Sequence, residues 1–292
     1  MRAFEWDGQP PTSTPMWDHD VVRRSGHLDG RRVALLVCGG IAAMKAPLVA
    51  RALRSRGAQV VAFCSEDALR YVGVDALEWS TLHPVVTRLT WRAEHLNDAA
   101  PFDAYLVAPA TYNTIGKVAS GIADTVVSAA LVSAIGRMRA GAAAVLVAPT
   151  MHGSMHTPIL ERQVGLLRDL GVRFITPRDA YGKHNLPDED VLVAAVTRAL
   201  ATGPWAGAAV RVQASPSGAA QRRAARVVEA LLLAGAEVRW VPSADAPDVP
   251  GWLPRGDDGA PVAWTWQVDE AGARATSASG DPGPALEGLA TP

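Results

Sequence analysis

The sequence predicts a doubly wound α/β domain, a parallel sheet with helices on both faces, and three features of the chain predict it. Short apolar runs recur from residue 32 onward, and segments with helical periodicity fill the gaps between them. Apolar runs without polar alternation are typical of parallel strands that are buried on both sides. Gly57, Gly141 and Gly171 each follow a helical segment and precede an apolar run, as glycines that end helices do.

The expected elements follow one another in strand–helix order. The predicted strands are VALLVC (33–38), VVAFC (60–64), AYLVAPA (104–110), AVLVAPT (144–150) and VRFITP (172–177). The predicted helices cover residues 43–56, 111–120, 124–136, 157–170 and 188–201.

The two ends of the chain differ from this pattern. Residues 1–30 are rich in proline, serine, threonine and charge, and we expect an irregular arm whose Trp6 and Trp17 pack on the domain or on a neighbouring subunit. The main domain is expected over residues 31–203. Residues 204–292 are expected to form a short C-terminal appendage that packs on the first domain or is partly disordered, because it is too short for an independent core of ordinary size. Its expected elements are strands at 209–215, 237–242 and 261–268 and a helix at 219–234, of which the first strand, the helix and the second strand make one small β-α-β fragment.

Composition restricts the possible partners. The formal net charge of −1 gives no electrostatic reason to expect binding to nucleic acid or to an anionic membrane. No stretch of eighteen apolar residues exists, and the first fifteen residues contain no apolar signal core. Cys38 and Cys64 each end an apolar run, which favours buried thiols in a reducing compartment. We therefore expect a cytoplasmic protein, and we expect no metal ion.

Candidate site residues follow the predicted strands, because ligands of doubly wound sheets bind at the carboxyl ends of the strands. The Gly39-Gly40 turn leads from a strand into a helix and suits an anion, yet neither G-x-G-x-x-G nor a Walker lysine motif is present. Ser65 and Thr111 begin helical segments, so each is an N-cap or a ligand contact. Taken singly, every one of these positions also has a purely structural interpretation.

Taken together, four segments resemble the flavin-containing cysteine decarboxylase family, which includes phosphopantothenoylcysteine decarboxylase and lantibiotic decarboxylases. Family sequences show a glycine turn of the type (S/T)-G-(G/S)-I-A-A-Y-K, a PASANT-type motif and a P-x-M-N-x-x-M motif. The resemblance covers about residues 30–202 and implies a Rossmann-like flavoprotein fold with FMN as cofactor. The matching segments are, in chain order, CGGIAAMK, FCSEDA, APATYNTIGKVASGIAD and APTMHGSMHTPIL.

The resemblance also implies roles for individual residues. The glycine turn and Ser65 would hold the FMN phosphate, and the segment from Thr111 would approach the flavin. His95, fourteen residues before Pro109, would be the general base, since histidine titrates near neutrality. The implied cofactor residues are Gly39, Gly40, Ile41, Ser65, Pro109, Ala110, Thr111 and Thr114; the implied catalytic residues are His95 and His152; the implied substrate residues are Asn113, Met151, Met155, Lys183 and His184.

The chemistry implied by the resemblance explains why a flavin is needed. Loss of carbon dioxide from a cysteine carboxylate requires an electron sink. Oxidation of the cysteine side chain by FMN gives a thioaldehyde, which accepts the electron pair of decarboxylation as an enethiolate.

The sequence departs from the family at three places. His152 stands where the family has the asparagine that contacts the substrate carboxylate, so either its imidazole binds the carboxylate or the chain is an inactive paralogue. Met44 replaces the tyrosine of the glycine-turn motif. Residues 178–187 contain no cysteine, whereas many coenzyme A pathway members carry one in a flap over the substrate. Either His184 or Lys183 then performs the final protonation, or the product is an enethiol.

The predicted function is therefore that of an FMN-dependent carboxy-lyase that converts 4′-phosphopantothenoylcysteine to 4′-phosphopantetheine in coenzyme A biosynthesis. The alternatives are oxidative decarboxylation of a peptide's C-terminal cysteine, and a non-catalytic FMN-binding regulatory or assembly protein. A prenyl-FMN-forming flavoprotein fits less well, because the methionine motif and His95 argue against it. The resemblance implies a homotrimer, or a multiple of trimers, with the active site between subunits. It also suggests that residues 204–292 are an eroded synthetase domain without ligase activity.

Overall fold

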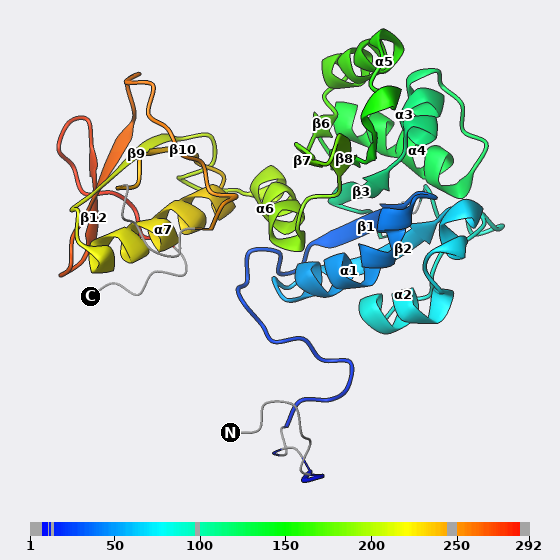
Figure 1. Ribbon diagram of the computed structural model, residues 1–292, viewed down its shortest axis with the longest axis horizontal. Helices are drawn as coiled ribbons and strands as arrows, with labels where there is room; N and C mark the ends of the chain where they lie inside the picture. The colour runs from blue at the N-terminus through cyan, green and yellow to red at the C-terminus, as the bar shows by residue number, and fades with distance from the viewer. Residues whose placement is uncertain (1–7, 11, 13–14, 97–99, 244–249, 287–292) are drawn as a thin grey trace.

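The computed structural model describes residues 8–10, 12, 15–96, 100–243 and 250–286. Two sheets, each with its own helices, lie side by side, and the helix α6 lies between them (Figure 1). We call the larger part the first unit and residues 205–286 the second unit.

The first unit contains the predicted parallel sheet. Its strand order is β2-β1-β3-β4-β6, and every neighbouring pair is parallel. β1 and β3 are almost completely buried along their length because both faces are covered. The strands are β1 (Arg32–Val37), β2 (Gln59–Cys64), β3 (Ala104–Ala110), β4 (Ala144–Pro149) and β6 (Arg173–Phe174).

Helices cover both faces of this sheet, which confirms the doubly wound architecture. One core cluster joins the sheet to α1 (Ala46–Arg54), α2 (Val74–Thr81) and α6 (Glu189–Leu200). The opposite cluster joins it to α3 (Tyr112–Ala119), α4 (Val126–Arg139) and α5 (Pro158–Asp169). Three short 3-10 turns lie at strand ends, namely η1 (Ile41–Lys45), η2 (Glu66–Arg70) and η3 (Gly153–Met155).

Local chemistry sets the helix ends that the sequence predicts. Ser65 Oγ accepts a hydrogen bond from Ala68 N (3.3 Å), and Thr111 Oγ1 accepts one from Thr114 N (3.4 Å), so both are N-caps. Gly57, Gly141 and Gly171 all have positive φ, which confirms their role at helix ends. The helix α2 was not predicted; its apolar residues form only a short, weakly periodic stretch, and it ends at Leu82 with φ 61°.

A small three-stranded antiparallel sheet lies beyond the end of β4 and was also not predicted. Its order is β5 (Met151–His152), β8 (Lys183–Asn185) and β7 (Arg178–Ala180). Tyr181 (φ 55°) and Gly182 (φ 66°) make the turn between β7 and β8, the backbone that a two-residue hairpin turn requires. We call residues 178–187 the flap.

The second unit has more structure than the sequence predicted. Its strand order is β10-β9-β11-β12, with α7 (Gly218–Leu233) packed on it, and the parallel pair β9–β10 confirms the expected β-α-β fragment. Trp205, Trp240 and Trp266 belong to a core of its own. Arg56 Nη2 lies 3.7 Å from Glu229 Oε1 and links α7 to the end of α1. The boundary between the main domain and the C-terminal appendage, near residue 203, remains a proposal. The strands are β9 (Ala209–Ala214), β10 (Glu237–Trp240), β11 (Trp264–Val268) and β12 (Ala273–Ser277).

The N-terminal arm is irregular over its described residues. Arg24 Nη1 lies 2.9 Å from Asp190 Oδ1, and Leu28 N donates to Arg56 O (2.9 Å), so the end of the arm is fixed to the first unit. Trp17 is 83% exposed and does not pack on the domain, and Trp6 lies outside the described residues.

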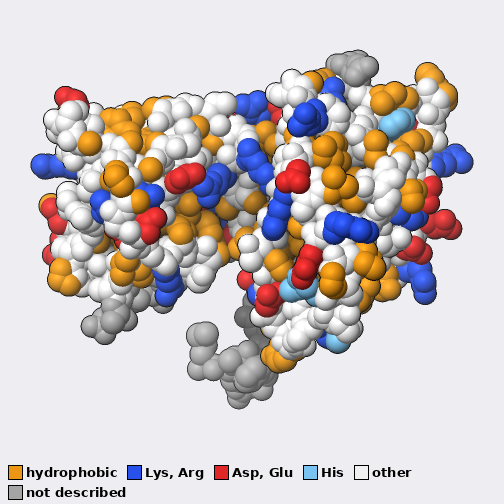
Figure 2. Space-filling model, turned by 90° about the horizontal axis from the view of Figure 1, so that it is seen from above, with side chains coloured by type: hydrophobic (Ala, Val, Ile, Leu, Met, Phe, Trp, Pro, Cys, Tyr) orange, Lys and Arg blue, Asp and Glu red, His pale blue; other side chains and the backbone are white. Residues whose placement is uncertain are grey.

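The surface is mixed in charge, as the net charge suggests. On the face that Figure 2 shows, basic and acidic side chains are interspersed among apolar ones. Among the helices that the structure describes, none is both long and apolar enough to cross a lipid bilayer.

Candidate active site

A cavity of about 370 Å³ lies where β1 and β3 end. The strand order reverses between these two strands, and ligands of open α/β sheets bind at this switch point. The volume falls in the range of small-molecule sites. Seven predicted site residues line the cavity: Gly39, Ser65, Thr111, Asn113, Thr114, Met151 and Met155.

The turn after β1 is packed so tightly that it requires glycine at its first position. A Cβ atom on Gly39 would lie 2.3 Å from Asp67 Cβ and 3.0 Å from the Asp67 carbonyl carbon. A Cβ on Gly40 would meet only Thr111 Cγ2, at 3.5 Å. Cys38 N donates to Pro109 O (3.3 Å), so the turn is also bound to β3. The backbone of the turn therefore forms one wall of the cavity.

Side chains with hydroxyl groups contribute much of the remaining lining. Thr111 and Ser65 serve both interpretations, since each caps a helix and lines the cavity. Sequence reasoning missed Thr125 and Ser128, which make a reciprocal capping box at the start of α4. The spacing T-x-x-S in DTVVS is the signal that could have found them. The other lining residues that sequence reasoning missed are Asp67, Tyr112, Lys117 and Thr150.

The cavity contains one ammonium group and two carboxylates at or near its lining. Lys117 Nζ lies 2.7 Å from Asp124 Oδ2, and this hydrogen bond lowers the pKa of Asp124. Asp67 is exposed and also lines the cavity. The hydroxyls and one lysine ammonium make a donor set that suits the phosphate and hydroxyl groups of a mononucleotide.

Both cysteines are buried beneath this edge of the sheet. Burial raises the pKa of Cys38, although hydrogen bonds with Thr114 and with the Thr111 backbone oppose the shift. Burial, and then the nearby Cys38, raise the pKa of Cys64 to about 12. Cys38 and Cys64 belong to different core clusters and therefore lie on opposite faces of the sheet. The two thiols therefore stay protonated at neutral pH.

The small sheet separates the remaining predicted residues onto two faces. Met151, His184 and Asp179 are register partners across β5, β8 and β7, so their side chains share one face. Because Met151 lines the cavity, this is the face nearer to it. His152 and Lys183 are also register partners and lie on the other face, where both are exposed.

The flap is bound directly to the methionine-motif segment. Gly153 N donates to Gly182 O (2.8 Å), and a Cβ on Gly153 would lie 2.6 Å from that oxygen. His156 Nδ1 lies 3.0 Å from His184 Nε2. Sequence reasoning missed His156, because no pattern within the sequence indicated a partner 28 positions away.

The structure does not bring His95 to the cavity of its own chain. The residue lies in the loop before β3 and is absent from the cavity lining. Its Nδ1 atom is buried and has no hydrogen-bond partner among the described residues. Ile41 is 69% exposed, and Pro109 and Ala110 are buried in β3, so these predicted cofactor residues also lie outside the lining.

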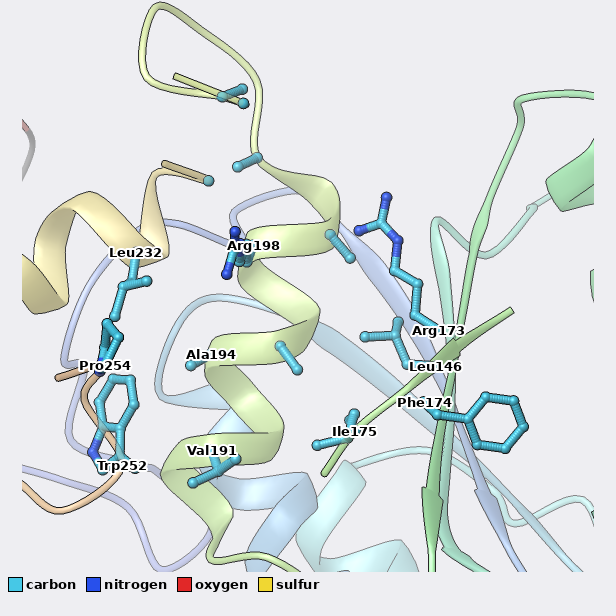
Figure 3. A pocket seen from close by; sticks show the side chains of 16 residues that line it. Leu146, Arg173, Phe174, Ile175, Val191, Ala194, Arg198, Leu232, Trp252 and Pro254 are labelled. Atoms are coloured by element: carbon cyan, nitrogen blue, oxygen red, sulfur yellow. The ribbon is translucent and has the colours of Figure 1, made fainter. Parts of the chain in front are cut away.

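A larger cavity, of about 740 Å³, lies between the two units. Figure 3 shows α6 between two sets of its lining side chains, with Leu146, Phe174 and Ile175 on one side and Leu232 and Trp252 on the other. Its lining is mostly apolar and contains none of the predicted site residues. We therefore place the chemistry at the smaller cavity, where the polar groups converge.

Comparison with known proteins shows the family of the first unit. The family model described as Flavoprotein matches residues 21–201. The chain is 37% identical over 182 residues to the coenzyme A biosynthesis bifunctional protein CoaBC of Thermococcus kodakarensis, covering 61% of this chain and 44% of that protein. It is 32% identical over 206 residues to the Bacillus subtilis protein of the same name, covering 65% and 49%. The chain thus spans about half the length of the curated relatives it matches.

Solved structures resemble the first unit. MrsD from Bacillus sp. HIL-Y85/54728 has a TM-score of 0.50 at 18% identity and covers 58% of this chain and 96% of its own, a likeness that concerns the fold alone. SpaF, described as an FMN-dependent cysteine decarboxylase, has a TM-score of 0.49 at 28% identity and covers 57% and 98%.

Proposed function

The chain belongs to the Flavoprotein family, and we propose that it is an FMN-dependent carboxy-lyase that converts 4′-phosphopantothenoylcysteine to 4′-phosphopantetheine in coenzyme A biosynthesis. One observation carries this proposal. The glycine turn, the Thr111–Thr114 segment and both methionines of the P-x-M motif line a single cavity at the switch point of the sheet. The names of the curated relatives support a role in coenzyme A biosynthesis.

The cavity suits FMN at the Gly39 wall. The close approach of Gly39 to Asp67 leaves no room for a side chain at this position, so the backbone of the turn is exposed to the cavity there. In the proposal, the Gly39-Gly40 turn and the Ser65 hydroxyl hold the phosphate, and Thr111 and Thr114 contact the flavin. When bound, FMN supplies the two-electron oxidation of the substrate's cysteine side chain.

His95 is the proposed general base, and it acts in a neighbouring subunit's cavity. Its absence from the lining of its own chain's cavity favours an assembly in which the loop before β3 meets another chain. Ile41 and Met44 are 69% and 59% exposed beside the glycine turn, an apolar surface that an assembly would cover. We propose a homotrimer, or a multiple of trimers, in the cytoplasm.

The substrate end of the site lies at the methionines. Asn113 is exposed at the start of α3, and Met155 is 43% exposed opposite it in the lining. These two residues and Met151 contact the substrate in the proposal. His152 lies on the outer face of the small sheet, so in the proposal it meets the carboxylate of a substrate held between subunits.

Turnover of the purified protein tests the proposal. We expect a yellow protein that releases FMN on denaturation and that, without oxygen, liberates carbon dioxide from phosphopantothenoylcysteine. The His95→Gln variant should keep the bound flavin and lose carbon dioxide release by at least a hundredfold, the usual contribution of a general base. A colourless protein that does not take up FMN would contradict the proposal, and so would a yellow one that leaves the substrate unchanged.

A second candidate is a decarboxylase of a peptide's C-terminal cysteine. The flap, which lacks a cysteine, favours it, and so does the exposure of Tyr181 at the flap tip, which is 95%. Carbon dioxide release from a cysteine-terminated peptide, with none from phosphopantothenoylcysteine, would select this candidate. We assign no ligase activity to the second unit.

A further inference from the structure

The larger cavity, of about 740 Å³, shares no lining residue with the candidate active site. It is bordered by β6 and Ile175 of the first unit, by one face of α6, and by the second unit (Figure 3). Its volume lies in the range of small-molecule sites, and such sites often lie between domains. The spacing of the lining residues of α6 is that of a single helix face. These residues are Val191, Ala194, Ala195, Arg198 and Ala199.

The polar side chains that line this cavity are all hydrogen-bond donors. They are the guanidinium groups of Arg173 and Arg198 and the indole N–H of Trp252, and none of these groups can accept a hydrogen bond. Among the described residues, the lining contains no carboxylate, hydroxyl or amide side chain. Nothing but backbone carbonyls could therefore pair with the hydroxyl groups of a sugar or the amino groups of a base. The lining suits a ligand that accepts hydrogen bonds and carries negative charge.

The two arginines bring positive charge that carboxylates of the chain do not neutralise. Within the described part of the chain, no ion pair joins Arg173 or Arg198 to an acidic side chain, and both arginines are exposed. The two carboxylates at the start of α6, on Glu189 and Asp190, lie 3.9 Å and 2.9 Å from a lysine and an arginine outside the cavity. The cavity therefore attracts anions.

The charge and the apolar surface lie at different ends of the cavity. Figure 3 shows the side chains of Arg173 and Arg198 level with the last turn of α6. The side chains of Ile175, Val191 and Trp252 lie level with its earlier turns (Figure 3). From Val191 to Arg198 the helix rises by about 10 Å, at about 1.5 Å per residue. A ligand that follows this gradient has an acidic group at one end and an apolar body of about this length.

We propose that the larger cavity binds a small carboxylic acid with an apolar alkyl or aryl body. Its carboxylate accepts hydrogen bonds from Arg173 and Arg198, because planar guanidinium groups match carboxylate oxygens. The carbonyl end of α6 carries partial negative charge, which disfavours a doubly charged phosphate and favours a single charge. The body of the acid packs along α6 against Ile175 and Trp252. This proposal does not rest on the proposed function.

Calorimetric titration of the purified full-length protein with octanoate tests the proposal. We expect saturable binding of one octanoate per chain. Octanol has the same alkyl chain without the charge, and it should bind more weakly by about tenfold or more, because it lacks hydrogen bonds to charged donors. Octyl phosphate should also bind more weakly than octanoate. No saturable binding of octanoate, or an affinity no higher than that of octanol or octyl phosphate, would overturn the proposal.

Substitutions in the lining test where octanoate binds. Arg173→Gln and Arg198→Gln should each weaken octanoate binding about tenfold and leave octanol binding unchanged. Arg222→Gln is the matched control, since it removes an exposed arginine on α7 that does not line the cavity. It should change neither affinity. Ala194→Trp, which fills the apolar part of the cavity, should weaken the binding of both ligands.

Two results of this second experiment would overturn the proposal. One is an octanoate affinity that stays the same in both arginine variants, since the acid would then bind elsewhere on the surface. The other is loss of octanoate binding when FMN is added to the unaltered protein. Competition with FMN would place octanoate in the smaller cavity, which shares no residue with the larger one.

Discussion

Two regions at the candidate site, the cradle and the flap, are built in opposite ways. The cradle, which we define as Gly39, Gly40, Ser65 and Thr111–Thr114, follows three long buried strands, and its polar groups also cap helices. The flap contains two strands of three residues, and the side chains of these strands are partly or largely exposed. The cradle is therefore held by packing, whereas the flap is held by polar contacts that water can reach, such as those of His184 with Asp179 and His156.

The largest effect is expected from a substitution that disrupts the packing of the cradle. In Gly39→Ala, the new Cβ would lie 2.3 Å from Asp67 Cβ and 3.0 Å from backbone, so η2 must move. We expect a loss of about 1 to 3 kcal/mol in unfolding free energy and loss of bound flavin. Flavin absorbance and urea unfolding measure both. Gly40→Ala is the matched control, since its Cβ meets only a methyl group at 3.5 Å; equal losses in the two variants would contradict the account.

The next largest effect is expected from a substitution that displaces the flap and leaves the cradle unchanged. In Gly153→Ala, the Cβ would lie 2.6 Å from Gly182 O, so the hairpin must move away from the methionine-motif segment. We expect flavin content to stay constant and carbon dioxide release to fall at least tenfold, measured anaerobically. Gly165→Ala, in open space on α5, is the control. Loss of flavin in Gly153→Ala would show that flavin binding by the cradle depends on the flap.

A smaller effect separates capping from ligand binding within the cradle. Thr111→Ala removes an N-cap and a cavity hydroxyl, whereas Ser217→Ala removes the N-cap of α7 far from the cavity. Each should lower the unfolding free energy by about 1 kcal/mol. Only Thr111→Ala should also weaken FMN binding in a fluorescence titration. An FMN affinity unchanged by Thr111→Ala would leave Thr111 with a structural role alone.

The last effect concerns the thiols under the cradle, and at neutral pH it is absent. The folded protein keeps the Cys64 proton up to a pKa of about 12, whereas an unfolded cysteine loses it near about 8.5. Between these values the folded state binds more protons, so stability falls as pH rises, by at most about 1.4 kcal/mol per pH unit. In urea unfolding at about pH 8 and pH 10, the unfolding free energy of Cys64→Ala should fall less between the two pH values than that of the unaltered protein. An identical decline would contradict the assigned pKa.

The first unit could be predicted well because its signals are local. Continuous apolar runs identified β1 to β4, and glycines with positive φ marked the helix ends. The resemblance to flavin-containing cysteine decarboxylases is confirmed at the level of the family. The residues of the cradle could be predicted from these strands, since residues that follow parallel strands meet at one edge of the sheet.

The flap and the last strand of the second unit, β12, could not be predicted because their signals are not local. Strands of two or three residues, such as β5, carry no periodicity, and pairing partners decide whether they form. The contact between His156 and His184 depends on the hairpin folding back onto η3. In the second unit, β12 has no apolar run, yet it pairs with β11 and completes a core.

The most direct test of the central claim, that the cradle holds FMN by its phosphate, is a comparison of FMN with riboflavin in binding to the flavin-free protein. Hydrogen bonds to a charged group contribute about 1.5 to 3 kcal/mol, so FMN should bind roughly 10 to 150 times more tightly. In Ser65→Ala this preference should shrink, and in Gly39→Ala it should disappear. Equal affinity for FMN and riboflavin in the unaltered protein would contradict the claim.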